Sequence, residues 1–312
     1  MDLKAFLNIL TEIIYILCGL VSISVAIRGL KNEKAKVGTF LFWFILGVIF
    51  ILGKTIPYAV TGGLLVILAL ITVTKQLQVG TFKEITHEFK VAQSEKFKNK
   101  IFLPAALIGI SAFLILQFKI GKVTIPSAVG IGGGALIALL VATAIIKPKF
   151  SETAEDTSRL LMQIGATALL PQLLAALGAV FTKAGVGKVI AQSISSVVPS
   201  GNIVVGIIIY AIGMALFTMI MGNAFAAFSV ITVGIGVPFI LKHGGNPAAI
   251  GALGMTAGYC GTLMTPMAAN FNIVPASILE IKDKNGIIKT QLPMGITMLI
   301  IHIIFMLLLF KA

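Results

Sequence analysis

Apolar residues occur along the first half of this chain in five runs, separated by short polar segments. Each run is close to the roughly 20 residues that an α-helix needs to cross the hydrocarbon layer of a membrane. The pattern therefore predicts five transmembrane helices, at residues 5–27, 37–52, 56–73, 101–118 and 123–146. In the last of them, Gly132, Gly133 and Gly134 indicate close packing against a neighbouring helix, because small side chains let two helix backbones approach.

The connection between the third and fourth runs also has a pattern of its own. Phe82, Ile85 and Phe89 recur at helical spacing among charged residues. This spacing predicts a short helix near 82–93 that lies on the cytoplasmic membrane surface. A solvated linker helix is the alternative. Residues 1–150 are thus expected to form a five-helix N-terminal scaffold.

The second half, residues 151–312, opens with an acidic loop and is less regular. We expect an apolar span with a kink at Pro171, a weakly amphipathic interfacial helix, a helical hairpin, a broken helix and a final span. These five elements are predicted at 160–181, 183–200, 202–241, 247–281 and 292–310.

The hairpin prediction depends on Gly222 and Asn223, which interrupt an otherwise apolar segment. Asn223 suits the first position of a new helix, because its side chain can accept hydrogen bonds from the unpaired N–H groups there. Gly222 supplies the backbone freedom that a tight turn needs. Two ordinary spanning helices joined by a short loop remain the alternative, since each arm is long enough to cross a membrane.

The broken helix is predicted from the polar stretch between Gly261 and Thr265. Thr265 followed by Pro266 is a strong signal for a new helix, since threonine caps an N-terminus and proline fits the first helical position. Two amides, Asn270 and Asn272, follow within two turns. We therefore expect a second helix to start at Thr265 and to run to Ile281.

Two helix N-termini inside the membrane would bring partial positive charge and free N–H groups to one place. Such a place suits a small carboxylate, and unwound carbonyl groups around Gly222 and Thr262 suit a sodium ion. Proton coupling is the alternative and would have to use Glu12, His302 or a partner; we expect sodium. The residues expected to bind the substrate are Gly222, Asn223, Ala224, Thr262, Thr265, Asn270 and Asn272. Those expected to take part in ion coupling are Gly222, Asn223, Gly261, Thr262 and Glu12.

Composition supports the membrane interpretation. The chain is 58% hydrophobic and 11% charged, and its mean hydropathy is +1.05. These values are outside the range of ordinary soluble domains. They predict an all-α polytopic membrane protein with about seven to nine spans, one of its elements a re-entrant hairpin and one a discontinuous helix.

The formal net charge of +13 comes mainly from lysines in the short loops. No basic patch with interleaved aromatic residues is present, so nucleic acid is not an expected partner. Lysine and arginine instead indicate orientation. If the N-terminus lies outside, the inner segments hold Arg28, Lys31, Lys34, Lys36, Lys75, Lys83, Lys90, Lys96, Lys98, Lys100, Lys147, Lys149 and Arg159, and the outer ones only Lys4, Lys54, Lys119 and Lys122.

Catalytic chemistry has little support in the sequence. Cys18 and Cys260 lie in apolar segments, with no metal-binding or disulfide pattern. An intramembrane enzyme would need Cys260 and His302 to meet by folding, and a proton relay at His302 is a separate alternative. A membrane scaffold without transport activity is a further alternative, although it does not explain why helices break. We predict no enzyme, no catalytic residue and no metal site.

The two interruptions read GNAFAAFSVITVGIGVP from Gly222 and GYCGTLMTPMAANFNIVP from Gly258. They resemble a bacterial membrane family that forms one subunit of a two-component pyroglutamate (5-oxoproline) transporter, and the resemblance covers most of the chain. More distantly, they resemble the ion-transporter superfamily of divalent-anion/sodium symporters and gluconate permeases. There the hairpin tip often reads Ser-Asn-Thr; only Asn223 matches, because Gly222 and Ala224 replace the hydroxyl residues.

The resemblance implies a secondary transporter subunit in the bacterial inner membrane that moves a small carboxylate, pyroglutamate, by ion-coupled alternating access. Members of the superfamily usually hold two inverted repeats, and this chain shows one hairpin and one broken helix. The other half would come from a second, different membrane subunit or from a second copy of this chain. Apart from the lipid bilayer, these are the expected partners.

Overall fold

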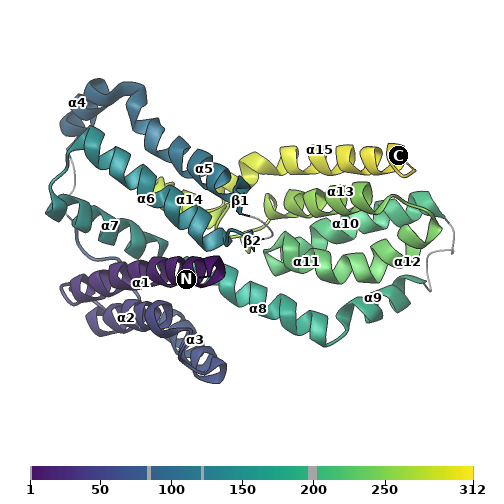
Figure 1. The fold of residues 1–312 in the computed structure, drawn as a ribbon, viewed down its shortest axis with the longest axis horizontal. Coiled ribbons are helices and arrows are strands. Elements are labelled where there is room, and N and C mark those ends of the chain that lie inside the picture. The colour runs from purple at the N-terminus through teal and green to yellow at the C-terminus, as the bar shows by residue number, and fades with distance from the viewer. Residues whose placement is uncertain (1, 83–85, 121–122, 196–201, 312) are drawn as a thin grey trace. The chain divides into compact units, whose positions relative to one another are not determined.

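The computed structural model describes residues 2–82, 86–120, 123–195 and 202–311 (Figure 1). It is 79% helical. The chain divides into two compact units, Met1–Gly165 and Ala166–Ala312, which we call unit 1 and unit 2 and describe separately. The expected boundary was at residue 150, and the structure instead groups the helix that follows it, at Phe150–Ile164, with unit 1.

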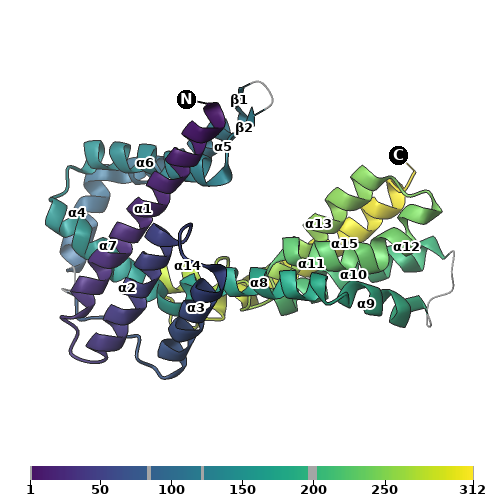
Figure 2. The same cartoon turned by 60° about the horizontal axis from the view of Figure 1, so that its bottom comes forward.

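The five predicted helices of unit 1 all form, within a few residues of their expected ends. The elements of unit 1 are α1 (Leu3–Gly29), α2 (Lys36–Leu52), α3 (Tyr58–Val73), α4 (His87–Phe97), a 3₁₀ turn (Lys98–Ile101), α5 (Phe102–Gln117), β1 (Lys119–Ile120), β2 (Val123–Thr124), α6 (Ser127–Ile146) and α7 (Phe150–Ile164). Helix α1 packs on α2, and α5 packs on α6 (Figure 2).

Glycine sets the spacing of both helix pairs. A Cβ atom on Gly19 would lie 2.8 Å from the carbonyl oxygen of Gly47, and one on Gly134 would lie 2.7 Å from that of Ile108. Both distances are too short for a real contact, so these helix backbones touch directly. The close packing predicted for Gly132–Gly134 is confirmed.

Two predictions in unit 1 need correction. The fifth span was expected to start at residue 123, but Val123–Thr124 pairs with Lys119–Ile120 as a two-stranded hairpin, and α6 begins only at Ser127, directly after Pro126. Where a surface helix was expected, near 82–93, the structure has helix α4 at His87–Phe97, and the Thr86 hydroxyl accepts from the N–H of Phe89 at 3.4 Å. That this helix lies on a membrane surface stays a prediction. Ile85, on which its apolar face depended, lies outside the described residues.

Unit 2 is built around α10. Its elements are a 3₁₀ turn (Gly165–Ala168) that begins at the boundary, α8 (Leu170–Lys183), α9 (Val186–Ser195), α10 (Ile203–Met221), α11 (Ala224–Ile231), a π-helical turn (Thr232–Gly236), α12 (Val237–Phe239), a 3₁₀ turn (Leu241–His243), α13 (Pro247–Thr262), α14 (Ile273–Ile278) and α15 (Gly286–Leu308). Helix α10 packs against α11, α13 and α15 (Figure 1). Its buried residues Ile207, Tyr210, Ala211 and Met214 form the centre of the core.

The apolar run predicted as one span at 160–181 is interrupted. Helix α7 ends at Ile164, and α8 begins at Leu170. Between them Gly165 adopts φ +54°, a left-handed conformation that ends a helix readily when glycine supplies it. The break therefore comes before Pro171, where the sequence had predicted a kink. The amphipathic segment beyond it forms α9, and residues 196–200 of the expected 183–200 lie outside the described part.

The broken helix also differs from its prediction. Helix α13 ends at Thr262, two residues into the break expected at 261–265. No helix starts at Thr265; the next is α14, from Ile273 to Ile278. The carbonyl oxygen of Thr265, which a helix starting there would use, instead accepts from Nδ2 of Asn272 at 2.7 Å, and the Thr265 hydroxyl donates to the carbonyl oxygen of Met219 in α10 at 2.8 Å. These hydrogen bonds hold the backbone in an irregular conformation, although Thr265-Pro266 locally favours a helix start.

The described residues contain six helices long and apolar enough to cross a membrane: Leu3–Gly29, His87–Gln117, Ser127–Ile146, Ile203–Met221, Ala224–His243 and Gly286–Leu308. Two shorter apolar helices, α2 and α3, accompany them. The final helix begins at Gly286, six residues before its predicted start at 292. The chain is therefore an all-α polytopic membrane protein.

Candidate functional site

The first interruption lies between α10 and α11, and it has the predicted local geometry. Gly222 adopts φ +65°, and its N–H donates to the carbonyl oxygen of Thr218 at 2.7 Å. Asn223 caps α11: its Oδ1 accepts from the N–H groups of Phe225 and Ala226, at 2.9 and 3.4 Å. The predictions of a glycine turn and an asparagine cap are both confirmed.

The second interruption, residues 263–272, is held together by Asn272. This side chain is fully buried. Its Nδ2 donates to two backbone carbonyl oxygens, that of Thr262 at 2.8 Å and that of Thr265 at 2.7 Å. The amide thus satisfies two carbonyl groups that would otherwise be left unpaired by the end of α13. The loop is an ordered structure and not a frayed helix end.

Thr265 joins the two interruptions. Its hydroxyl donates to the carbonyl oxygen of Met219, three residues before Gly222, and accepts from the N–H of Met267 at 3.2 Å. Thr265 is itself 4% exposed. The loop after α13 is therefore fastened to the last turn of α10, next to the turn that leads into α11.

Close packing of α13 on α10 brings the interruptions together. A Cβ atom on Gly258 would lie 3.1 Å both from the Cβ of Ala224 and from the hydroxyl of Thr218, and one on Gly261 would overlap the carbonyl oxygen of Ala215. No larger residue fits at Gly261 without moving a helix backbone. The small residues that the sequence singled out here therefore act as packing contacts.

Two buried polar atoms in this region have no hydrogen-bond partner among the described residues. They are the hydroxyl oxygen of Thr218 and Oδ1 of Asn272, and both side chains are 0% exposed. A buried polar group without a partner costs about 1–3 kcal/mol. Such groups often mark a place where a solute or water binds.

Three aromatic side chains adjoin the tip of the hairpin. The ring centroid of Tyr259 lies 6.0 Å from that of Phe225 and 6.4 Å from that of Phe271, and both pairs are edge-to-face. They come from α13, from the first turn of α11 and from the loop at 263–272. Phe225 and Phe271 are exposed, at 64% and 43%. The Asn223 cap is therefore close to an accessible aromatic surface.

Neither Asn270 nor Glu12, both assigned to the site from the sequence, takes part in the hydrogen bonds that join the two interruptions. Asn270 is exposed on the loop, in contrast to Asn272. Glu12 belongs to α1 of unit 1, where its Oε1 lies 3.2 Å from Nζ of Lys54. Gly261 and Thr262 are buried at the end of α13, and the carbonyl of Thr262 is already bonded to Asn272. Within the described residues, no group of three or more potential metal ligands occurs.

Cys260 and His302 do meet by folding, but not in the geometry of a catalytic pair. The thiol lies 3.9 Å from Nδ1 of His302 and donates to the carbonyl oxygen of Thr256 at 3.5 Å. Nδ1 in turn lies 2.6 Å from the carbonyl oxygen of Met298. Because a carbonyl only accepts, Nδ1 carries the hydrogen and cannot take the proton of the thiol through this contact.

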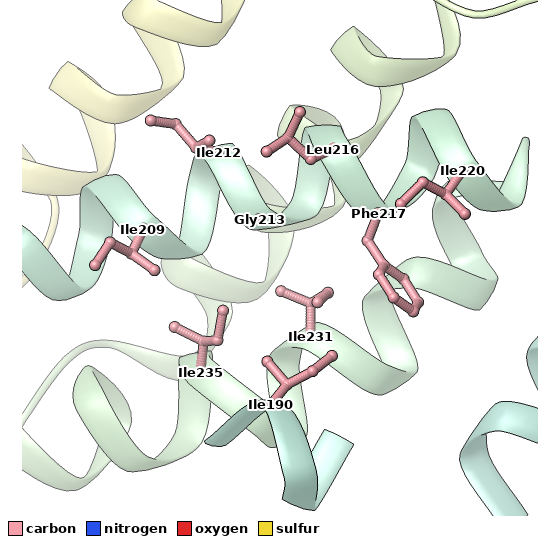
Figure 3. Close-up of a pocket in the computed structure, with 9 residues that line it drawn as sticks. All are labelled: Ile190, Ile209, Ile212, Gly213, Leu216, Phe217, Ile220, Ile231 and Ile235. Carbon is pink, nitrogen blue, oxygen red and sulfur yellow. The ribbon is translucent and has the colours of Figure 1, made fainter. Parts of the chain in front are cut away.

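An open groove of about 280 Å³ lies along another face of α10. Figure 3 shows that apolar side chains line it, among them Ile190 from α9, Phe217 from α10 and Ile231 from α11. None of the predicted site residues contributes to it. The groove has no polar group that would orient a carboxylate, so we do not assign the site to it.

Three features of this region were not predicted from the sequence. They are the hydroxyl of Thr218, the aromatic cluster of Phe225, Tyr259 and Phe271, and the π-helical turn at Thr232–Gly236. Thr218 was detectable, since it is the one threonine in α10 and lies just before the break. In the π turn, the hydroxyl groups of Thr232 and Tyr210 lie 2.9 Å apart. No local pattern distinguishes such a turn from an α-helix.

The model of a family described as a protein of unknown function, DUF979, matches residues 12–310. Comparison with curated proteins and with solved structures finds no match.

Proposed function

The chain belongs to the DUF979 family, and we propose that it is the membrane subunit of a secondary active transporter that moves a small carboxylate by alternating access. The observation that carries the proposal is the hydrogen bond from Thr265 to the carbonyl of Met219, which joins two helix interruptions at one place. In hydrocarbon, non-helical backbone persists only where it is buried in protein or lines a polar cavity. Two joined interruptions inside one membrane protein therefore favour a solute site.

The carboxylate would bind at the N-terminus of α11. Asn223 uses Oδ1 to cap the helix, and its Nδ2 has no hydrogen bond to any described residue. That amide N–H group and the positive end of the helix dipole both favour an anion. The hydroxyl of Thr218 is a further donor close by, and the ring of a cyclic acid would lie against Phe225 and Tyr259.

This arrangement revises the sequence-based hypothesis of two facing helix N-termini. Helix α11 supplies one, but the loop at 263–272 takes the place of the second. Asn272 acts as the organiser of that loop, and Thr265 acts as its anchor. Asn223 and Thr218 are then the residues we expect to touch the substrate.

Several finer points are part of the proposal. The hairpin at 202–241 is re-entrant, the N-terminus lies outside the bacterial inner membrane, and a second membrane subunit or a second copy completes the site. The hairpin follows from the absence of charge around Gly222, although α10 and α11 are each long enough to cross the membrane. Orientation follows from the lysine-rich inner loops. Pyroglutamate is the substrate that the family resemblance suggests.

Ligand-dependent thermal stabilisation tests this function, because a ligand that binds only the folded state raises its melting temperature. It is measured on the purified chain together with the subunit or second copy that completes its site. The panel would contain pyroglutamate, other small carboxylates, and 2-pyrrolidone, which has the same ring without the carboxylate. We expect pyroglutamate to stabilise the wild type and 2-pyrrolidone to have no effect. If no carboxylate stabilises the chain or is exchanged by it in proteoliposomes, the proposed function is wrong.

The Asn223→Ser variant locates the site. Serine caps a helix about as well as asparagine, so folding should be preserved, but the Nδ2 donor is lost. A hydrogen bond to a charged group is worth about 1.5–3 kcal/mol, so affinity should fall about tenfold or more. Asn246→Ser is the matched control, because Asn246 caps α13 in the same way, with 2.9 and 3.2 Å hydrogen bonds. Equal loss of binding in both variants would contradict the assignment.

A further inference from the structure

His302 is a mostly buried imidazole in the last helix, α15, and the carboxylate site does not use it. Its side chain is 9% exposed. Its Nδ1–H donates to the carbonyl oxygen of Met298, one turn earlier, at 2.6 Å. With the hydrogen on Nδ1, the other ring nitrogen, Nε2, carries a free lone pair. The structure therefore presents a proton acceptor inside an apolar helix.

The imidazole lies against the end of α13. Its Nδ1 is 3.9 Å from Sγ of Cys260, and Cys260 is two residues before the last residue of that helix, Thr262. The last turn of a helix carries partial negative charge from its unpaired carbonyl groups, which stabilises a nearby cation. A charge on the His302 ring would therefore act on the last turn of α13.

No competing charge comes from the helices that pack on α15. These are α13 and α10. Neither contains an acidic or basic residue, and the one charged residue of α15 is Lys289, in its first turn. The titratable groups that they do contain are Cys260 and Tyr259 in α13 and Tyr210 in α10; the Tyr210 hydroxyl lies 2.9 Å from that of Thr232.

The same end of α13 leads into the loop that is fastened beside the proposed carboxylate site. Thr262 and Thr265 offer their carbonyl oxygens to Asn272, and the Thr265 hydroxyl reaches Met219 beside the α11 cap. A conformational change in the last turn of α13 would alter the surroundings of both His302 and the loop at 263–272.

We propose that His302 is the proton-binding site that couples proton movement to carboxylate binding at the helix interruption. This inference rests on the proposed function. A proton from the aqueous phase binds at Nε2 and later returns to the aqueous phase, and no bond of any other group changes. Protonation favours the ordered end of α13, and through Asn272 and Thr265 it favours the conformation that binds the carboxylate.

The test compares pyroglutamate binding and transport across the range in which histidine titrates, about pH 5 to 8. In the wild type we expect an affinity change of about fivefold or more. His302→Asn keeps an N–H group for the carbonyl of Met298 but cannot bind a proton. This variant should bind with the same affinity at every pH, and it should retain substrate exchange while it loses accumulation driven by a proton gradient.

The other two histidines are matched controls, since both are exposed. His87→Gln and His243→Gln should leave the pH dependence of binding unchanged. If His302→Asn does not fold, protonation of His302 can be measured directly on the wild type. The ¹⁵N NMR signals of the imidazole in the full-length chain should show Nε2 taking up a proton, and pyroglutamate should shift that titration by the same factor by which protonation changes its affinity.

The outcomes separate the two hypotheses. If the wild type binds pyroglutamate and His302→Asn keeps the same pH dependence, the coupling inference is wrong and the proposed function stands. If the wild type neither binds nor exchanges any carboxylate, the proposed function is wrong, and the NMR titration decides the proton site alone. If His302 does not titrate between about pH 5 and 8, the coupling inference is wrong.

Discussion

The two units satisfy their buried polar groups in different ways. In unit 1, Ser22 and Ser158 donate to carbonyl oxygens four residues earlier in their own helices, at 3.0 and 2.8 Å. In unit 2, Asn272 and Thr265 bond to backbone groups beyond their own turn, and the Thr265 contact spans 46 residues of sequence. These two serines of unit 1 are therefore satisfied within single helices, whereas the interrupted helices of unit 2 are held by bonds to other segments.

The difference is informative because a self-satisfied helix needs nothing from its neighbours except packing. An interrupted helix needs side chains that replace the lost backbone bonds, and those side chains fix where polar groups meet. Among the described residues of unit 1, Asn32 and Thr39 make comparable bonds. Nδ2 of Asn32 donates to the carbonyl oxygen of Gln78 at 3.1 Å, and Thr39 accepts from the N–H of Gln78 at 3.2 Å and donates to its carbonyl at 3.3 Å. These bonds hold an exposed connection after α3, whereas Thr265 holds the candidate site.

The largest effect on stability should come from Asn272→Ala. The substitution leaves the buried carbonyl groups of Thr262 and Thr265 without a donor, at about 1–3 kcal/mol each. We expect a marked fall in the melting temperature of the detergent-solubilised chain. Asn270→Ala, two residues away and exposed, is the control and should change stability by less than about 0.5 kcal/mol. Equal melting temperatures for both variants would mean that the loop does not depend on Asn272.

A smaller effect is expected from Thr265→Val, which has a similar shape without the hydroxyl. It removes the donor to Met219 and the acceptor for Met267, and it should cost about 1–3 kcal/mol and weaken pyroglutamate binding. Thr39→Val is the counterpart in unit 1. It should cost less, because the Gln78 carbonyl keeps Asn32 as a donor at 3.1 Å, and it should leave binding unchanged. If pyroglutamate binding weakened in Thr39→Val and not in Thr265→Val, the contrast drawn between the two units would be wrong.

The smallest effect concerns an exposed ion pair at the start of α15. Nζ of Lys289 donates to Asp283 at 2.8 Å and holds the pKa of that carboxyl below its usual range. A lowered pKa means that the pair stabilises the fold at neutral pH and that this contribution is lost as the pH falls through the lowered value. Asp283→Asn should slightly lower the melting temperature at neutral pH. In strong acid, its melting temperature should equal that of the wild type.

Local patterns predicted much of the fold. The apolar runs placed α1, α2, α3, α5 and α6 within a few residues, because burial in hydrocarbon requires a helix of a given length. The turn at Gly222 and the cap at Asn223 were also predictable. The cap joins Asn223 only to Phe225 and Ala226, so its geometry depends on neighbouring residues alone.

Where a helix restarts was not predictable from neighbouring residues. Thr265-Pro266 has the local features of a helix start, but the Thr265 hydroxyl bonds to Met219 and the chain stays irregular as far as Asn272. The same limit applies to the π-helical turn, in which Thr232 meets Tyr210 from α10. In both cases a partner more than 20 residues away decided the local backbone.

The sequence by itself determined that this is a helical membrane protein, where most of its helices lie, and that Gly222 and Asn223 end one helix and begin another. Hydrophobic length and short-range hydrogen bonds are properties of adjacent residues. Only the tertiary structure decided that Thr265 would meet Met219 and that His302 would meet Cys260, 42 residues away. Those contacts depend on how closely α13 packs, and Gly258, Gly261 and Gly295 determine that distance.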